Sequence, residues 1–233
     1  MTLAQGIERV LDRVGLSDTT EEFKDRARDY INQILAEVAP LVKWWWLNRT
    51  TTFNTVASTR AYQPVSGAVT EWYSFVNETQ DRRLDIIGPD EFDALDPDLS
   101  RTGTVYNVFI AGQDTTTGYP VVELYYTPNA VETIRVRYCA DIDEWTSAND
   151  TADMMALGVP RIMESVLIYG AASLLLEENG DDGGAAREGG NFSRALDAAK
   201  IQNVRMQGNR RWTAIPAGDI NRGLITLGTD TVS

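Results

Sequence analysis

The 233-residue sequence contains no histidine and only one cysteine, Cys139. Histidine is the side chain most used for proton transfer near neutral pH and the commonest metal ligand, so Ser–His–Asp and Cys–His catalysis are excluded within this chain. A single cysteine forms neither an internal disulfide nor a cysteine-based zinc site, and in its strand-like surroundings a packed thiol is expected. We therefore predict no catalytic residue, no metal site and no cofactor.

Basic residues are also scarce. The chain has 21 Lys and Arg against 34 Asp and Glu, which gives a net charge of −13. This balance argues against a surface that holds nucleic acid or an anionic membrane, and it suits a surface that DNA passes without sticking. The most apolar stretch, residues 159–176, contains Arg161 and Glu164 and so makes a poor membrane span. No signal peptide is predicted at the N-terminus.

Motifs for nucleotide and calcium binding are missing too. The glycines between positions 180 and 190 match neither a phosphate-binding loop nor a dinucleotide fingerprint, and the acidic run at 180–184 lacks the spacing of a calcium loop. Carboxylate pairs such as Asp85 with Asp90 are expected by chance in so acidic a chain. A solvated face explains them better than a hydrolytic site.

What is present begins with two amphipathic patterns that predict helices over 2–14 and 19–38. Gly15 is expected to end the first, and Asp18 with Glu21 resembles a capping box at the start of the second. Arg28 is expected on the solvent side of the second helix, and Pro40 is expected to mark where this helix ends. Two further helices are predicted, one opening at Pro160 with apolar residues nearly all round and one over 186–207, separated by a flexible turn at 180–184.

Between these helical parts, the apolar period changes to two. Because the connections look too short for parallel crossovers, the pattern predicts an antiparallel, meander-like module. A helical turn with proline at its start is predicted at 89–93. The predicted strands lie at 51–56, within 68–76, and at 83–87, 104–111, 120–126 and 132–139.

Three adjacent tryptophans, Trp44, Trp45 and Trp46, lie between the first helical part and the strands. Burying about 200 Å² of each would contribute roughly 15 kcal/mol in gross terms, so they are not expected in water. One interpretation is a core junction between helices and sheet. The other is that a neighbouring subunit buries at least one of them, which makes all three candidates for a subunit interface.

The segment from 210 to 233 differs in character from the rest of the chain. It carries basic and apolar residues without enough consecutive apolar positions to fold alone. We interpret it as an extended arm that orders on a partner with an acidic pocket; a frayed terminus is the alternative. The proposed anchors are Arg210, Arg211, Trp212, Ile215 and Ile220.

Together these segments predict an α+β protein, with a helical bundle framework of about four helices, an inserted antiparallel β module and an extended C-terminal arm. The predicted domains are 1–48, a helical part; 49–153, the β module; 154–209, a second helical part that packs with the first; and 210–233, the arm.

Several pieces of sequence, in order, resemble the head-to-tail adaptor, or connector, proteins of tailed bacteriophages, especially the short-tailed type. The resemblance covers about residues 1–210, and its most specific piece is Tyr-Tyr-Thr-Pro at 125–128 followed by 132–138. The other pieces are 27–35, the tryptophans with 50–52 and 58–62, 84–95, and the long helix after Pro160.

The resemblance implies a structural virion protein, assembled in the host cytoplasm, that forms a dodecameric ring beneath the portal. It implies that DNA passes through the lumen without sequence recognition, that a tail nozzle or tail-tube protein lies below, and that the C-terminal arm docks on the portal. The arm beyond 210 matches no motif, so its role follows from position alone. Two alternatives remain: a tail-tube or tail-completion protein, and a carbohydrate-binding or hydrolytic β module using Trp72 and Tyr73.

Overall fold

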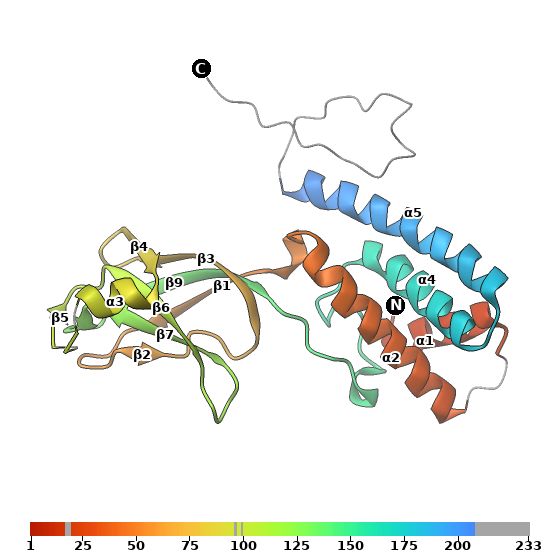
Figure 1. Ribbon diagram of the computed structural model, residues 1–233, viewed down its shortest axis with the longest axis horizontal. Coiled ribbons are helices and arrows are strands. Elements are labelled where there is room, and N and C mark those ends of the chain that lie inside the picture. The colour runs from red at the N-terminus through yellow and green to blue at the C-terminus, as the bar shows by residue number, and fades with distance from the viewer. Residues whose placement is uncertain (17–19, 96, 99, 208–233) are drawn as a thin grey trace, which may run out of the picture.

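The structure is a computed structural model that describes residues 1–16, 20–95, 97–98 and 100–207. The molecule is elongated, with helices gathered at one end and a curled sheet at the other (Figure 1). Two chain segments run between these ends, one after the second helix and one after the last strand. The predicted α+β class is confirmed.

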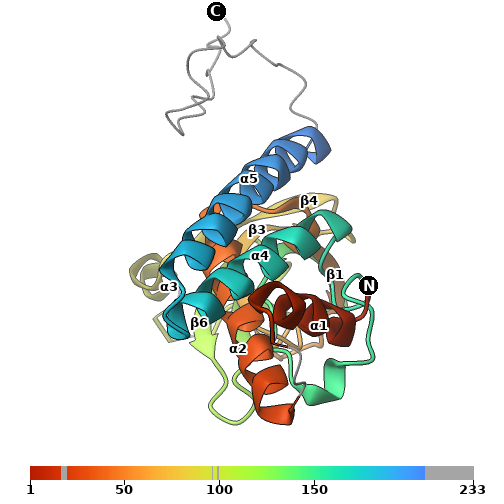
Figure 2. The ribbon, with the colours of Figure 1, turned by 90° about the vertical axis from the view of Figure 1, so that its right-hand side faces the viewer.

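The described residues form five α-helices, where about four were expected. The additional helix, α3, is the turn predicted around Pro89, and it lies with the strands. The other four helices pack together (Figure 2). The helices are α1 (Leu3–Val14), α2 (Glu21–Val38), α3 (Pro89–Leu95), α4 (Arg161–Glu178) and α5 (Asp182–Met206), with 3-10 turns at η1 (Ala39–Leu41), η2 (Trp45–Leu47) and η3 (Ser147–Asn149).

Helix ends follow local sequence rules with two departures. Gly15 ends α1 in the left-handed conformation at φ 77°, as expected. The start of α2 is Glu21, with Thr20 in the N-cap position; the predicted cap Asp18 lies outside the described residues. The turn expected at 180–184 is wrong in its second half, because the Asp181 carboxylate accepts a hydrogen bond from the Gly184 amide and draws Asp182 to Gly184 into α5.

Helix α4 is the centre of the helical part. It contacts α1, α2 and α5, and its side chains are buried on several sides. An apolar pattern nearly all round a helix requires this environment, so the prediction from the sequence is confirmed. Close contact with α2 is possible because position 170 is glycine: a Cβ there would lie 2.8 Å from two side-chain carbons of Ile34.

We expect Gly170→Ala to lower the free energy of unfolding by about 1–3 kcal/mol, because the added methyl group would also crowd Cγ1 and Cγ2 of Ile34, which lie close to the α2 backbone. Urea denaturation followed by circular dichroism measures this change. Ile34→Ala should cost less stability in the Gly170→Ala chain than in the parent, because the two changed side chains are in contact.

Gly190→Ala is the matched control. This glycine is also helical, but nothing lies within 4 Å of where its Cβ would be, so the substitution should stabilise the protein by up to about 1 kcal/mol. Equal loss of stability in both variants would contradict close packing at Gly170.

The strands form a seven-stranded mixed sheet in the order β1-β9-β3-β4-β6-β7-β2 and a separate pair, β5 with β8. Each predicted strand is found, with ends moved by no more than three residues. The strands are β1 (Asn48–Asn54), β2 (Ala61–Tyr62), β3 (Val69–Asn77), β4 (Arg82–Ile87), β5 (Thr102–Gly103), β6 (Asn107–Gln113), β7 (Pro120–Tyr125), β8 (Thr127–Pro128) and β9 (Thr133–Ala140).

The prediction of a purely antiparallel module is wrong. β4 pairs with β6 in parallel, and β5 pairs with β8 in parallel. The segment between β4 and β6 contains α3, which gives the chain enough length to return to the same end of the sheet. The remaining neighbours in the seven-stranded sheet are antiparallel.

The sheet curls until its two outer strands meet. The rings of Phe53 on β1 and Tyr62 on β2 pack in a tilted arrangement with centroids 5.1 Å apart, although these strands stand at opposite ends of the strand order. The Tyr62 hydroxyl also bonds to the backbone of Val56 and Thr59. The curl encloses a core of Phe75, Leu84, Val105, Val108, Val122, Leu124, Ile134 and Val136.

Arg28 is not on the solvent face where its position in the sequence placed it. It is 5% exposed, and its guanidinium bonds to both carboxylate oxygens of Asp150, at 3.0 and 2.8 Å, and to Asp25. The backbone of residues 150–154 also bonds to the first residues of the chain. Arg28 thus joins α2 to the segment that holds the start of α1.

Candidate subunit and partner interfaces

The three tryptophans lie in the linker, residues 39–48, which runs from the end of α2 to β1. Trp44 is 1% exposed and donates from its indole nitrogen to the Val38 carbonyl at 2.9 Å. Trp46 is 6% exposed, and its ring lies 6.3 Å from that of Trp44. The chain itself therefore buries these two rings, whereas Trp45 is half-buried and keeps part of its surface exposed.

The end of α5 is fastened to the same linker. The Asn203 side chain accepts from the Trp45 amide at 2.8 Å and donates to the Lys43 carbonyl at 3.0 Å. Gln207 donates to the same carbonyl. Lys43 in turn pairs with Glu71 on β3 at 2.6 Å. The predicted arm therefore follows a helix end that is bonded to the junction between helices and sheet.

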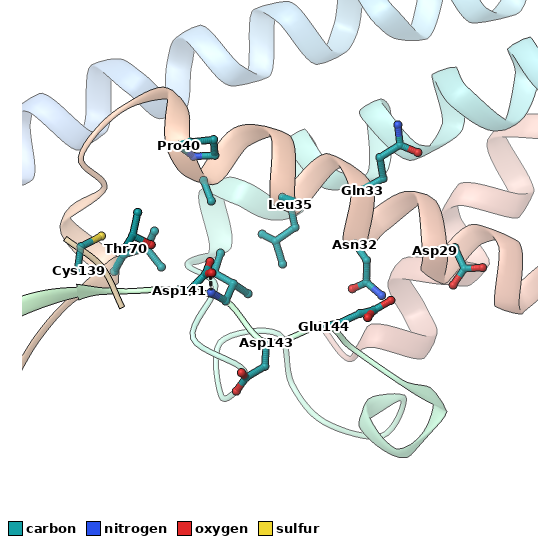
Figure 3. Close-up of a pocket in the computed structure, with 14 residues that line it drawn as sticks. Asp29, Asn32, Gln33, Leu35, Pro40, Thr70, Cys139, Asp141, Asp143 and Glu144 are labelled. Carbon is teal, nitrogen blue, oxygen red and sulfur yellow. Dashed lines mark hydrogen bonds between the residues drawn. The ribbon is translucent and has the colours of Figure 1, made fainter. Parts of the chain in front are cut away.

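A groove lies beside this junction, between α2 and the segment that leaves β9 (Figure 3). We call it the linker groove. It has a volume of about 650 Å³, and its apolar lining comes mainly from α2, the linker and the 139–144 segment. These apolar residues are Leu35, Ala36, Ala39, Pro40, Leu47, Cys139 and Ile142.

The charged lining of the linker groove is entirely acidic among the residues that form it. Asp29 contributes from α2, and Asp141, Asp143 and Glu144 from the segment after β9. All four are exposed. Between the walls, Asn32 exchanges two hydrogen bonds with the Trp145 backbone, at 2.8 and 3.0 Å, which fixes the 141–145 segment against α2.

Near the β-strand end of this groove, Cys139 is buried beside Tyr73, as expected for a packed thiol. Burial raises the pKa of the Tyr73 hydroxyl above its ordinary value, and the neighbouring Cys139 thiol adds to the effect. Trp72 and Tyr73 are half-buried, with Trp72 packed on Phe75 and Tyr138, so they do not form the exposed platform that a sugar-binding module would use.

A second cavity, of about 440 Å³, also borders the 141–144 segment. Trp46, Arg49, Tyr138 and Trp145 are among the residues that line it. The Trp46 indole nitrogen is buried and has no hydrogen-bond acceptor among the described residues.

Sequence reasoning did not find the groove. Nothing local in the sequence pairs residues 141–145 with α2, so the four acids could not be placed on one groove. The arm anchors Arg210, Arg211, Trp212, Ile215 and Ile220 lie outside the described residues. Within the part of the chain that is described, no cluster of three or more potential ligands could hold a metal ion, and no helix is long and apolar enough to cross a membrane.

Comparison with known families decides the class of protein. The sequence model of the SU10 adaptor protein family matches residues 1–217, which includes both helical parts and the whole sheet. The chain belongs to this family. The resemblance to phage head-to-tail adaptors is therefore confirmed, and this adaptor is a structural component of the virion. No curated protein matches the sequence significantly.

Proposed function

We propose that the adaptor forms a closed ring of twelve copies beneath the portal, joins the capsid to a tail nozzle or tail-tube protein and lets DNA pass through its lumen. The family match over residues 1–217 carries this proposal. In it, residues 1–48 and 154–209 form the framework of the ring, and 49–153 extend from it. The separation of helices and sheet into two ends of an elongated subunit supports this division (Figure 1).

The charge of the chain also supports the proposal. A net charge of −13 makes electrostatic adhesion of DNA phosphates unfavourable, as a DNA passage requires. DNA is then a passing cargo whose sequence is not read.

Portal docking is assigned to residues 210–233. They follow α5, whose last turn is bonded to Lys43, so tension on the arm would act on the junction itself and not on a loose end. Arg210, Arg211 and Trp212 are the proposed anchors, with Ile215 and Ile220 as further apolar contacts. A partly exposed Trp45 is the proposed subunit contact in the linker.

We expect the full-length variant with Arg210→Glu, Arg211→Glu and Trp212→Ala to lose portal binding by at least tenfold, while its unfolding transition stays within about 0.5 kcal/mol of the parent protein. Removal of all residues after Gly208 should give the same result. Pull-down of purified portal, with electron microscopy of the complex, measures the binding and the ring symmetry.

A variant with Arg9→Glu and Arg83→Glu is the control, since it reverses two exposed charges on α1 and β4. It should bind portal as the parent does. Full portal binding by the arm variant would contradict the docking role. Rings that assemble only below the tail tube, without contact to portal, would favour a tail-tube or tail-completion protein.

A further inference from the structure

We propose that, while portal is absent, the linker groove of one adaptor subunit holds the segment 209–216 of a neighbouring copy. This inference rests on the proposed ring and names one contact between its subunits. The segment reads Asn-Arg-Arg-Trp-Thr-Ala-Ile-Pro. It combines two adjacent positive charges with two large apolar side chains.

The groove and the segment are complementary in charge. Asp29, Asp141, Asp143 and Glu144 line the groove, and no basic side chain does. Opposite charges at the edge of a docking surface steer the encounter and fix its register. Arg210 and Arg211 are the basic residues of 209–216, and this segment follows a chain that is acidic overall.

They are also complementary in apolar surface. The floor of the groove is formed by Leu35, Leu47 and Ile142 with the small residues Ala36, Ala39 and Pro40. Its volume of about 650 Å³ falls within the range of cavities that bury most of a bound group, roughly 300–1,000 Å³. An indole buries about 150–250 Å² when it docks in such a site. Trp212 would supply the main anchor and Ile215 a second.

The position of the groove favours a second copy over the same chain. α5 crosses one side of α2, and the groove opens on the other side (Figures 1 and 3). The last turn of α5 is held at Lys43 by Asn203 and Gln207. Its own segment would have to pass around the linker to enter the groove. An extended stretch of eight residues covers roughly 27 Å, which sets how far the groove of the neighbouring copy can lie from the end of α5.

The test replaces Trp212 in the full-length protein with the photoreactive residue benzoylphenylalanine. Equal amounts of ¹⁵N-labelled and unlabelled protein are unfolded in urea and refolded together without portal, so that assemblies contain both isotopes. They are then irradiated and digested for mass spectrometry. We expect crosslinked peptides of mixed isotope content that join position 212 to residues 29–47 or 139–144. Crosslinks only within one isotope, crosslinks to other surfaces, or no crosslinks would each overturn the proposal.

Charge reversal provides the second arm of the test. Asp141→Lys with Asp143→Lys should lower the crosslink yield by at least about fivefold, whereas Asp90→Lys with Asp93→Lys on the exposed face of α3 should leave it unchanged. Crosslinking should return when the Asp141→Lys, Asp143→Lys chain is mixed with a photoreactive chain carrying Arg210→Glu and Arg211→Glu. An equal loss of crosslink yield in the two double variants would count against the groove. So would a failure of crosslinking to return when the two charge-reversed chains are mixed.

These measurements do not use portal. A protein that fails to bind portal but gives the expected crosslinks would contradict the proposed function of the arm and leave the groove contact in place. A protein that binds portal but does not give the expected crosslinks would contradict the groove contact and leave the proposed function of the arm in place.

Discussion

Replacing Arg28 with leucine should lower the free energy of unfolding of the adaptor by about 2–4 kcal/mol. The side chain of Arg28 is 6% exposed and forms ion pairs with Asp25 and Asp150. Removing one partner of a buried pair leaves the other charged group without compensation, at a cost of about 3–5 kcal/mol in fully buried cases. The side chain of Asp150 is 26% exposed, so water recovers part of that cost. Urea denaturation monitored by circular dichroism measures the change.

Arg26→Leu is the matched control for this prediction. Arg26 lies on the same helix and pairs with Glu22 and Glu178, but its side chain is 43% exposed. Exposed pairs of this kind contribute about 0.2–1 kcal/mol. A double variant, Arg28→Leu with Asp150→Leu, should be destabilised by less than the sum of the two single variants, because it leaves no unpaired carboxylate at position 150. Equal losses in the free energy of unfolding of Arg26→Leu and Arg28→Leu would show that the buried ion pair stabilises the protein no more than the exposed one.

The burial of Arg28 shows why the sequence did not predict every part of the fold. The spacing of apolar residues places the helix correctly, because it identifies the buried face of α2 without knowledge of distant residues. The fate of a polar residue depends on its partner, and Asp150 is 122 residues away. A charged residue on the polar face of a predicted helix is expected to be exposed to solvent. The sequence pattern does not show when a distant carboxylate packs against it.

The same distinction explains the sheet. Alternation of apolar and polar residues located the six longer strands, but the two-residue strands β2, β5 and β8 were not predicted. Alternation within one strand does not show whether that strand runs parallel or antiparallel to its neighbour. The parallel pairing of β4 with β6 depends on the path of the chain through α3 between them. The connections between strands were judged too short for parallel crossovers, but the segment between β4 and β6, which contains α3, is long enough for one. The meeting of Phe53 with Tyr62 likewise follows from the curl of the whole sheet.

The linker groove is a further feature of this kind. Its walls come from α2, from Leu47 and Thr70, and from the segment after Cys139, and these pieces are brought together by the fold. The family, in contrast, was predicted from the order of short pieces of sequence and is confirmed. The anchors in the arm remain predictions, because they lie outside the described residues.

Trp44 is the residue whose truncation should cost the subunit most. It is 1% exposed among the helices, and its indole nitrogen donates to the Val38 carbonyl at the end of α2. Trp44→Ala removes a buried aromatic side chain and leaves that carbonyl without its donor, so we expect a loss of about 3–5 kcal/mol. At roughly 2–4 °C per kcal/mol for a chain of this size, the midpoint of thermal unfolding should fall by about 6–20 °C.

Trp45→Ala separates subunit stability from assembly. Its ring is only half-buried within the subunit, so truncation should cost the isolated chain less than Trp44→Ala does. If a neighbouring subunit covers the rest of the ring, this variant should instead weaken ring formation, as measured by sedimentation at several protein concentrations. Trp44→Phe, which keeps most of the apolar volume, should lie between the parent and Trp44→Ala in stability. We therefore expect Trp44→Ala to change mainly the unfolding of the subunit and Trp45→Ala to change mainly ring formation. If both variants changed unfolding and ring formation equally, the two adjacent tryptophans would not have separate roles.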